Sequence, residues 1–164
     1  MICRIRPPAS MACCALALCF AAPPALATPS SGFTSTMVGP TVFEEVDATT
    51  TTGKHQVTIK TSGTSDVYVV TNTVTPGGHS GWHTHPGPSL VSVKSGTATY
   101  YEGDDPTCTP RVVKAGDGFV DHGGGHIHFI RNEGNVELVL VAVQIVPAGA
   151  MRRIDAPAPG NCRF

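Results

Sequence analysis

Short strand-like runs separated by turn signals extend from residue 41 to residue 146, and this pattern constrains the fold most. The runs are rich in Thr, Val, Ile, Phe and Tyr and alternate roughly between apolar and polar residues. Glycine, aspartate and asparagine lie between them. No stretch after residue 27 repeats apolar residues with a helical period over three turns. We therefore predict an all-β sandwich or barrel with little helix. The predicted strands span 41–52, 54–61, 66–74, 89–94, 96–101, 111–114, 119–121, 126–131 and 136–146.

The first 27 residues have the features of a secretory signal peptide. Two arginines precede an apolar run over 11–22, and the Ala-Leu-Ala at 25–27 is a small-x-small cleavage pattern. A membrane-spanning helix needs roughly 20 apolar residues, so this run is too short for a span. We expect cleavage after Ala27, a secreted or periplasmic protein, and no stable membrane anchor after cleavage.

Charge and cysteine content limit which partners and which covalent links we expect for the rest of the chain. Without residues 1–27 it has nine basic and twelve acidic residues, a formal charge of −3, and no basic patch that would favour nucleic acid. Four of the six cysteines also fall in the leader, which leaves Cys108 and Cys162. An even pair in an exported chain predicts one disulfide, which would close a loop of about fifty residues and fix the tail.

The domain organisation follows from these features. Residues 1–27 are the expected signal peptide, and residues 28–40, which are rich in Thr, Ser, Gly and Pro, are expected to form a flexible lead-in. Residues 41–146 form a single β-domain. The Pro- and Gly-rich residues 147–164 form a C-terminal tail on its surface, tied down by the cysteine pair.

Two histidine-rich stretches are the candidate functional segments. In the first, 77–96, His83 and His85 alternate as on a β-strand, where side chains at i and i+2 share a face roughly 6 to 7 Å apart. That spacing suits two ligands of one metal ion. The second stretch, 123–132, contains His126 and His128 about forty residues later, and a sheet would bring a third ligand from it to the first pair.

The first stretch resembles the first motif of the cupin superfamily, G-x5-H-x-H-x3,4-E-x6-G, in which both histidines and the glutamate are metal ligands. Gly77, His83, His85 and Gly96 match at the required spacing. Ser89 stands where the glutamate belongs. The resemblance, to a small single-domain cupin of the type-2 kind, implies a double-stranded β-helix, also called a jelly-roll barrel, over residues 41–146.

The second stretch resembles the second cupin motif, G-x5-P-x-G-x2-H-x3-N. Counted backwards from Asn132, the motif puts His128 at the ligand position and Gly123 at the proline position, with one extra residue after Gly116. Counted forwards, it puts Ile127 at the ligand position, which leaves no ligand. The resemblance thus implies His128 as the third ligand, with His126 as the alternative.

A three-histidine site has consequences for chemistry. Neutral imidazoles bind Fe, Mn, Zn, Ni or Cu ions, and the sequence does not choose among these metals. Without the glutamate, a divalent ion keeps its full charge and favours anionic or chelating ligands. The candidates for a fourth ligand or for supporting the site are Ser89, Glu102, Asp121, His122 and His126.

The resemblance to cupins leaves two functions open, because this fold serves many activities. The first is a secreted metal-binding cupin, either catalytic as an oxygenase or isomerase acting on a small anionic or chelating metabolite, or metal-binding only. The second is a metal-free, non-catalytic module that binds a sugar or another small ligand. The resemblance also implies a homodimer, since cupins commonly pair through their sheets.

Overall fold

The computed structural model describes residues 27–164, and almost all of the expected signal peptide lies outside these residues. The described part is built from twelve strands without a helix, as predicted, and therefore contains no helix that would cross a membrane. The strands are β1 (Ser31–Phe43), β2 (Asp47–Thr52), β3 (His55–Lys60), β4 (Ser65–His79), β5 (His83–Thr84), β6 (Ser89–Ser95), β7 (Thr97–Glu102), β8 (Arg111–Lys114), β9 (Gly118–Asp121), β10 (His128–Arg131), β11 (Leu138–Pro147) and β12 (Ile154–Asp155).

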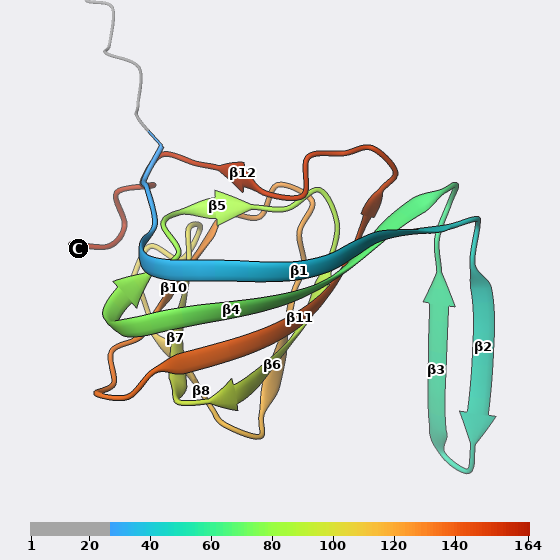
Figure 1. Cartoon of the computed structure of the whole chain (residues 1–164), viewed down its shortest axis with the longest axis horizontal. Coiled ribbons are helices and arrows are strands. Elements are labelled where there is room, and N and C mark those ends of the chain that lie inside the picture. Colours follow the sequence, from blue (N-terminus) through green and yellow to red (C-terminus); the bar gives the residue numbers. More distant parts are fainter. Residues whose placement is uncertain (1–26) are drawn as a thin grey trace, which may run out of the picture.

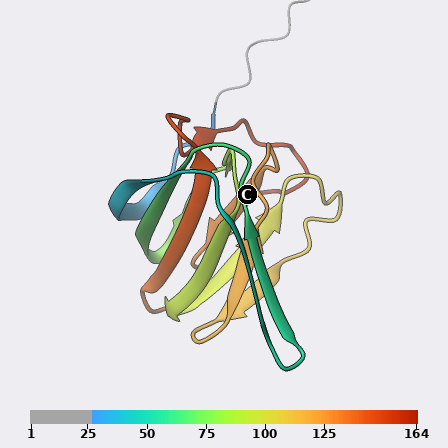
Figure 2. The ribbon, with the colours of Figure 1, turned by 90° about the vertical axis from the view of Figure 1, so that its right-hand side faces the viewer.

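Ten of these strands form a barrel of two antiparallel layers (Figures 1 and 2). One layer has the order β1-β4-β11-β6-β9, and the other has the order β8-β7-β10-β5-β12. Strand β4 joins the layers, since most of its length pairs with β11 whereas His79 at its end pairs with Arg131 of β10. The core between the layers consists of Val70, Val74, Val91, Val93, Ala98, Tyr100, Val113, Phe119, Ile130, Leu138, Leu140 and Ala142.

Alternation along β11 explains why the apolar run near residue 140 forms a strand rather than a helix. Leu138, Leu140 and Ala142 point into the barrel, and the intervening valines lie on the outer face. Buried positions two residues apart are the signature of a sheet with one face on a core. Gln144 continues the inward series and is the one polar residue in it, with only 4% of its surface exposed.

The expected flexible lead-in over 28–40 is wrong for most of its length. Residues 31–43 form β1, which pairs with β4 from Phe43 opposite Ser65 to Ser31 opposite His79 (Figure 1). Apolar side chains contribute little to this strand beyond Phe33, which packs against the core. The free backbone groups along the edge of β4 stabilise it instead, and composition alone does not reveal such an edge.

Part of the expected barrel range 41–146 also lies outside the barrel. The predicted strand over 41–52 is interrupted at 44–46, and β2 and β3 pair only with each other. This hairpin extends away from the barrel (Figure 1), and all its residues are exposed. Its cross-strand contacts include an ion pair of 2.7 Å between Lys60 and Asp47.

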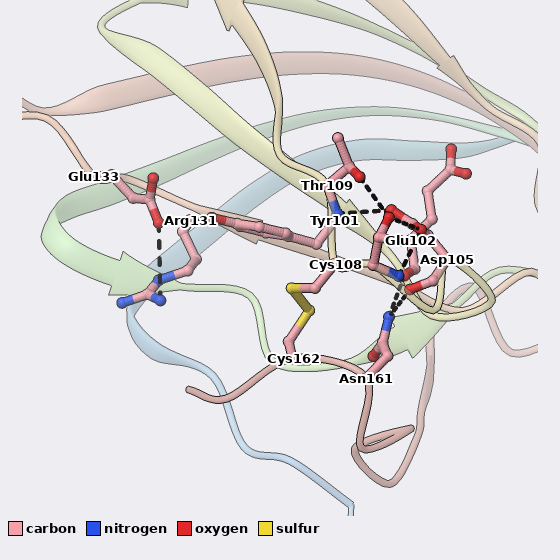
Figure 3. The surroundings of a disulfide bond; sticks show 10 residues. Tyr101, Glu102, Asp105, Cys108, Thr109, Arg131, Glu133, Asn161 and Cys162 are labelled. Atoms are coloured by element: carbon pink, nitrogen blue, oxygen red, sulfur yellow. Dashed lines mark hydrogen bonds and ion pairs between the residues drawn. A yellow bond between two sulfur atoms is a disulfide. The ribbon is translucent and has the colours of Figure 1, made fainter.

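The C-terminal tail lies on the barrel as predicted and is held by a disulfide (Figure 3). Cys108 and Cys162 form the bond, with their Cα atoms 5.3 Å apart. Beside it, the Asn161 amide donates hydrogen bonds to the carbonyls of Glu102 and Asp105. The disulfide covers a second small core outside the barrel, formed by Trp82, Tyr101, Phe129 and Ala156.

Candidate metal centre

Three buried histidines converge inside the barrel. His83 of β5 lies directly opposite His128 of β10 in the ladder, and His85 follows just after β5. The ring centroids are 4.2 Å apart for His83 and His128, 5.0 Å for His83 and His85, and 5.4 Å for His85 and His128. One ring nitrogen from each histidine lies within 4.8 Å of the others. Nitrogens this close suit a single metal ion of about 2.1 Å bond length.

Backbone carbonyls orient two of the three rings. His83 Nδ1 donates to the carbonyl of Gly81 at 2.9 Å, and His85 Nδ1 donates to the carbonyl of Arg152 at 2.7 Å. These bonds fix the tautomer that leaves Nε2 with its lone pair free, as in metal-binding histidines generally. The buried Nδ1 of His128 has no hydrogen-bond partner among the described residues. An unpaired polar nitrogen at such depth is the donor that a metal would satisfy.

Burial keeps these imidazoles neutral. It is the main reason that the pKa of His83 lies well below the ordinary value of 6.5, with the charges of His128 and Arg153 adding to the effect. Burial also lowers the pKa of His85, and it lowers that of His128 to about 4 even though Asp121 opposes the shift. At neutral pH all three rings are therefore in the form that binds metals.

A carboxylate stands beside the histidines on β9. Asp121 Oδ2 lies 3.5 Å from His85 Nε2, and its Oδ1 lies 3.6 Å from His128 Nδ1. The Gly123 backbone N–H donates to Oδ1 at 3.0 Å and fixes the side chain. In the ladder, Asp121 faces Ser89, whose hydroxyl donates to Oδ2 at 3.5 Å. Asp121 and Ser89, both predicted, thus lie at the site.

Glu102, His122 and the alternative ligand His126 lie away from the three histidines. His126 pairs with Asp104 at 3.3 Å and forms a separate, partly exposed group with Glu102. His122 is next to His126, with ring centroids 6.4 Å apart. Of the two alternatives for the third ligand, the structure therefore brings His128, and not His126, to His83 and His85.

The turn before β10 accounts for the irregular second motif. Gly123, at the position of the motif's proline, has a φ of +63°, which proline cannot adopt. A Cβ atom there would also overlap the backbone carbonyl of Gly87. The extra residue thus belongs to a glycine turn that still delivers His128 to the ligand position.

Gln144, Arg152 and Arg153 are polar residues at the site that were not predicted. Gln144 donates to Ser89 Oγ at 3.1 Å and accepts from Arg152 Nη1 at 2.7 Å. The sequence indicated Gln144 only as a single polar residue at an inward-facing position of an apolar strand. Arg152 and Arg153, which come from the tail, gave no such signal, because nothing in a Pro- and Gly-rich segment indicates which barrel face it will cross.

These groups surround a cavity of about 240 Å³. The three histidines and Asp121 form one part of its wall, and Phe33 and Phe119 contribute apolar surface. The remaining lining residues are Ser30, Ser35, Asn72, Ser89, Val91, Ile130, Leu140, Ala142, Gln144, Arg152 and Arg153. The cavity therefore combines a group of three histidines, a carboxylate and two guanidinium groups.

Comparisons with known proteins give one family and several similar structures. An uncharacterised conserved protein with a double-stranded β-helix domain from Klebsiella pneumoniae is 25% identical over 73% of this chain and 90% of that chain, with a TM-score of 0.47. An oxalate oxidase is 28% identical over 50% and 46% of the two chains, with a TM-score of 0.42. A predicted oxalate decarboxylase from Thermotoga maritima is 23% identical over 51% and 82%, with a TM-score of 0.40. No curated protein sequence matches the chain.

The family model described as "Cupin domain" matches residues 70–144. That segment contains His83, His85 and His128 and both glycine-rich motifs around them. Its strands form the central part of the two-layer antiparallel barrel. Residues 70–144 of this chain therefore form a domain of the cupin superfamily.

Proposed function

We propose that His83, His85 and His128 bind one divalent transition metal. The observation that carries the proposal is the convergence of three buried, neutral imidazoles, two of which have Nδ1 bonded to backbone carbonyls. Fe, Mn, Zn, Ni and Cu all accept such ligands, and the donor atoms do not select one of them.

We further propose that Asp121 supplies the carboxylate of this centre. Its oxygens lie 3.5 to 3.6 Å from imidazole nitrogens of His85 and His128, and it is 2% exposed. A carboxylate this deeply buried needs a positive partner, and a metal ion provides one. Asp121 thus places one carboxylate beside the three nitrogen ligands, although the family's glutamate position is occupied by Ser89.

The proposed activity is metal-dependent catalysis, of the oxygenase or isomerase type, on a small anionic or chelating metabolite. A bound metal would supply Lewis acidity or a site for dioxygen. The chain supplies a cavity of about 240 Å³, below the roughly 300–1,000 Å³ of pockets for drug-sized ligands, so the ligand must be small. Asp121 is the residue placed to accept a proton from a ligand held beside His85 and His128.

The decisive experiment is elemental analysis of protein purified without chelators, followed by oxygen-consumption and hydrolysis screens with and without Fe(II). About one metal ion per chain and turnover of a small acid would support the proposed activity. Protein that contains no metal under any condition would contradict the metal proposal and favour the metal-free module that binds a sugar or another small ligand.

We also propose that the protein is exported, by the signal peptide expected over residues 1–27. Support comes from the disulfide between Cys108 and Cys162, since such bonds persist in secreted and periplasmic proteins and are rare in reducing compartments. The N-terminal sequence of the protein recovered from outside the cytoplasm would begin at Thr28 if cleavage follows Ala27.

Finally, we propose that the protein forms a homodimer through the outer face of the layer containing β4. A row of exposed aliphatic side chains crosses all five strands of this layer in register. Monomeric proteins rarely expose contiguous apolar surface of this kind, and a second copy would cover it. The row consists of Val38, Val69, Val143, Leu90 and Val120, each between 36% and 72% exposed.

A further inference from the structure

Two arginines of the C-terminal tail line the same cavity as the histidines. Arg152 and Arg153 lie between β11 and β12, outside the segment that matches the family model. Both are only partly exposed and contribute to the cavity wall. The tail is thus part of the site and not only a covering of the barrel.

The charge of Arg152 is not compensated within the described chain. Its Nη1 donates to the neutral amide oxygen of Gln144 at 2.7 Å, and no carboxylate among residues 27–164 lies within ion-pair distance. Burial is the largest cause of the lowered pKa of Arg152, and the neighbouring charge of Arg153 adds to it. A partly buried guanidinium without a counter-ion is costly, and a bound anion would remove that cost.

Arg153 adds a second positive charge at the cavity. Its Nη2 donates to the Ser80 carbonyl at 2.6 Å, and its Nε pairs with Asp155 at 2.7 Å on the exposed side. These bonds hold the guanidinium in place at the wall. The cavity lining contains only one carboxylate, Asp121, and this lies beside the histidines.

We propose that Arg152 and Arg153 form an anion subsite that binds the carboxylate of a small ligand, while a second oxygen of that ligand reaches the metal centre. The assignment of the second oxygen rests on the proposed metal site. A guanidinium binds a carboxylate through two parallel N–H bonds, which suits recognition in a cavity of this size. The ligand class is therefore a small 2-oxo, 2-hydroxy or dicarboxylic acid.

The tail couples this subsite to the metal centre. The carbonyl of Arg152 accepts the bond from His85 Nδ1, so the residue that presents the guanidinium also orients a metal ligand. Two residues further on, Ile154 and Asp155 of β12 pair with Thr84 and His83. The position of Arg152 is therefore fixed by β5, the strand that contains His83.

The test is calorimetric titration of metal-loaded protein, in a chloride-free buffer, with lactate, pyruvate and malonate, and with lactamide as the neutral analogue of lactate. We expect at least one acid to bind, and lactamide to bind at least roughly ten-fold more weakly than lactate if lactate is that acid. Arg152→Gln should weaken binding of the acid by a similar factor at unchanged metal content, and Arg152→Lys should have an intermediate effect. Arg163→Gln removes the same charge from an exposed tail position and should bind the acid as the parent protein does.

Metal content and melting temperature are measured on each variant. They show whether weaker binding of the acid results from loss of the metal or of the fold, rather than from loss of the guanidinium. Failure of all three acids to bind metal-loaded protein would overturn the subsite, as would an Arg152→Gln variant that binds like the parent. If the parent protein contains no metal, the metal proposal fails. The same titrations of metal-free protein then decide the subsite alone, because the guanidinium groups should still distinguish lactate from lactamide.

Discussion

Ser89 of β6 and Asp121 of β9 lie directly opposite each other in the barrel wall, joined by a hydrogen bond of 3.5 Å. The first cupin motif calls for a carboxylate on β6, at the position of Ser89. In this chain the nearby carboxylate comes from the neighbouring strand instead. The substitution of a ligand residue by serine therefore does not remove the negative charge from the site.

This relationship predicts that Asp121 supports metal binding. We expect Asp121→Asn to weaken the metal affinity by about 10- to 100-fold, the usual loss when a supporting carboxylate is removed. Ser89→Glu, introduced into that variant, should recover part of the affinity, because it restores a carboxylate on the adjacent strand. Competition with a metal-chelating dye measures both effects. Asp117→Asn, at an exposed turn, is the control, and an unchanged affinity in Asp121→Asn would contradict the prediction.

Removal of one imidazole should abolish stoichiometric metal binding. His83→Ala leaves two histidine ligands, and we expect its metal content to fall below about one tenth of an ion per chain after dialysis. His55→Ala, on the exposed hairpin, should retain the parent's metal content. Elemental analysis of both proteins, with circular dichroism to verify folding, makes the comparison. Equal metal content would show that the ion binds elsewhere.

The buried histidines should make the metal-free protein sensitive to acid. Their pKa values are lower in the folded protein than the 6.5 of an exposed histidine, and that of His128 falls to about 4. The unfolded chain therefore binds more protons between these values, and the free energy of unfolding decreases as the pH falls from about 6.5 towards 4. We expect a loss of about 1–3 kcal/mol.

Urea unfolding of metal-free protein at pH 7.5 and pH 5 measures this loss. His128→Gln lacks one of the titrating rings, so its stability should change less between the two pH values than that of the parent. An equal change in the two proteins would show that His128 does not contribute.

Loss of the disulfide should destabilise the protein and loosen the tail. The bond spans 54 residues, for which the loop-entropy model gives about 4 kcal/mol. We expect Cys162→Ser to lower the free energy of unfolding by an amount of this order and to speed amide exchange at Ile154 and Asp155. Unchanged exchange in β12 would show that the ladder with β5 holds the tail without the disulfide.

A charge in the exposed aliphatic row should dissociate the expected dimer. Leu90 lies within the row and is 59% exposed, so Leu90→Lys would place two buried charges in a two-fold interface. We expect the dimer dissociation constant to rise roughly ten-fold or more. Val112→Lys, at an exposed position of the other layer, is the matched control. Light scattering after size exclusion gives both masses, and a parent protein that is monomeric would contradict the proposal.

Periodicity and spacing predicted much of the barrel. The runs that contain Tyr100, Val113 and Leu140 all became strands, because alternating apolar residues form a core face regardless of the rest of the chain. The two motifs likewise predicted which histidines would meet. Glycine spacing carries that information, since turns fix where each strand begins.

Features that depend on pairing between distant segments were not predictable. Strand β1 forms on the free edge of β4, and its own composition resembles that of a linker. Arg152 reaches the cavity only because the tail folds back along β5. Gln144 was detectable in principle, as a lone polar residue among buried positions, but its partner in the tail was not.

Arg152 and Arg153 line the cavity but lie outside the segment that matches the family model. The family segment ends at Gln144, and the guanidinium groups follow only eight and nine residues later. Substitutions limited to the side chains of Arg152 and Arg153 would thus change the charge of the cavity wall, while the backbone bonds of the tail to His85 and β5 stay in place. In this architecture, the charge of the cavity is set in part by two side chains that lie outside both the matched segment and the apolar core.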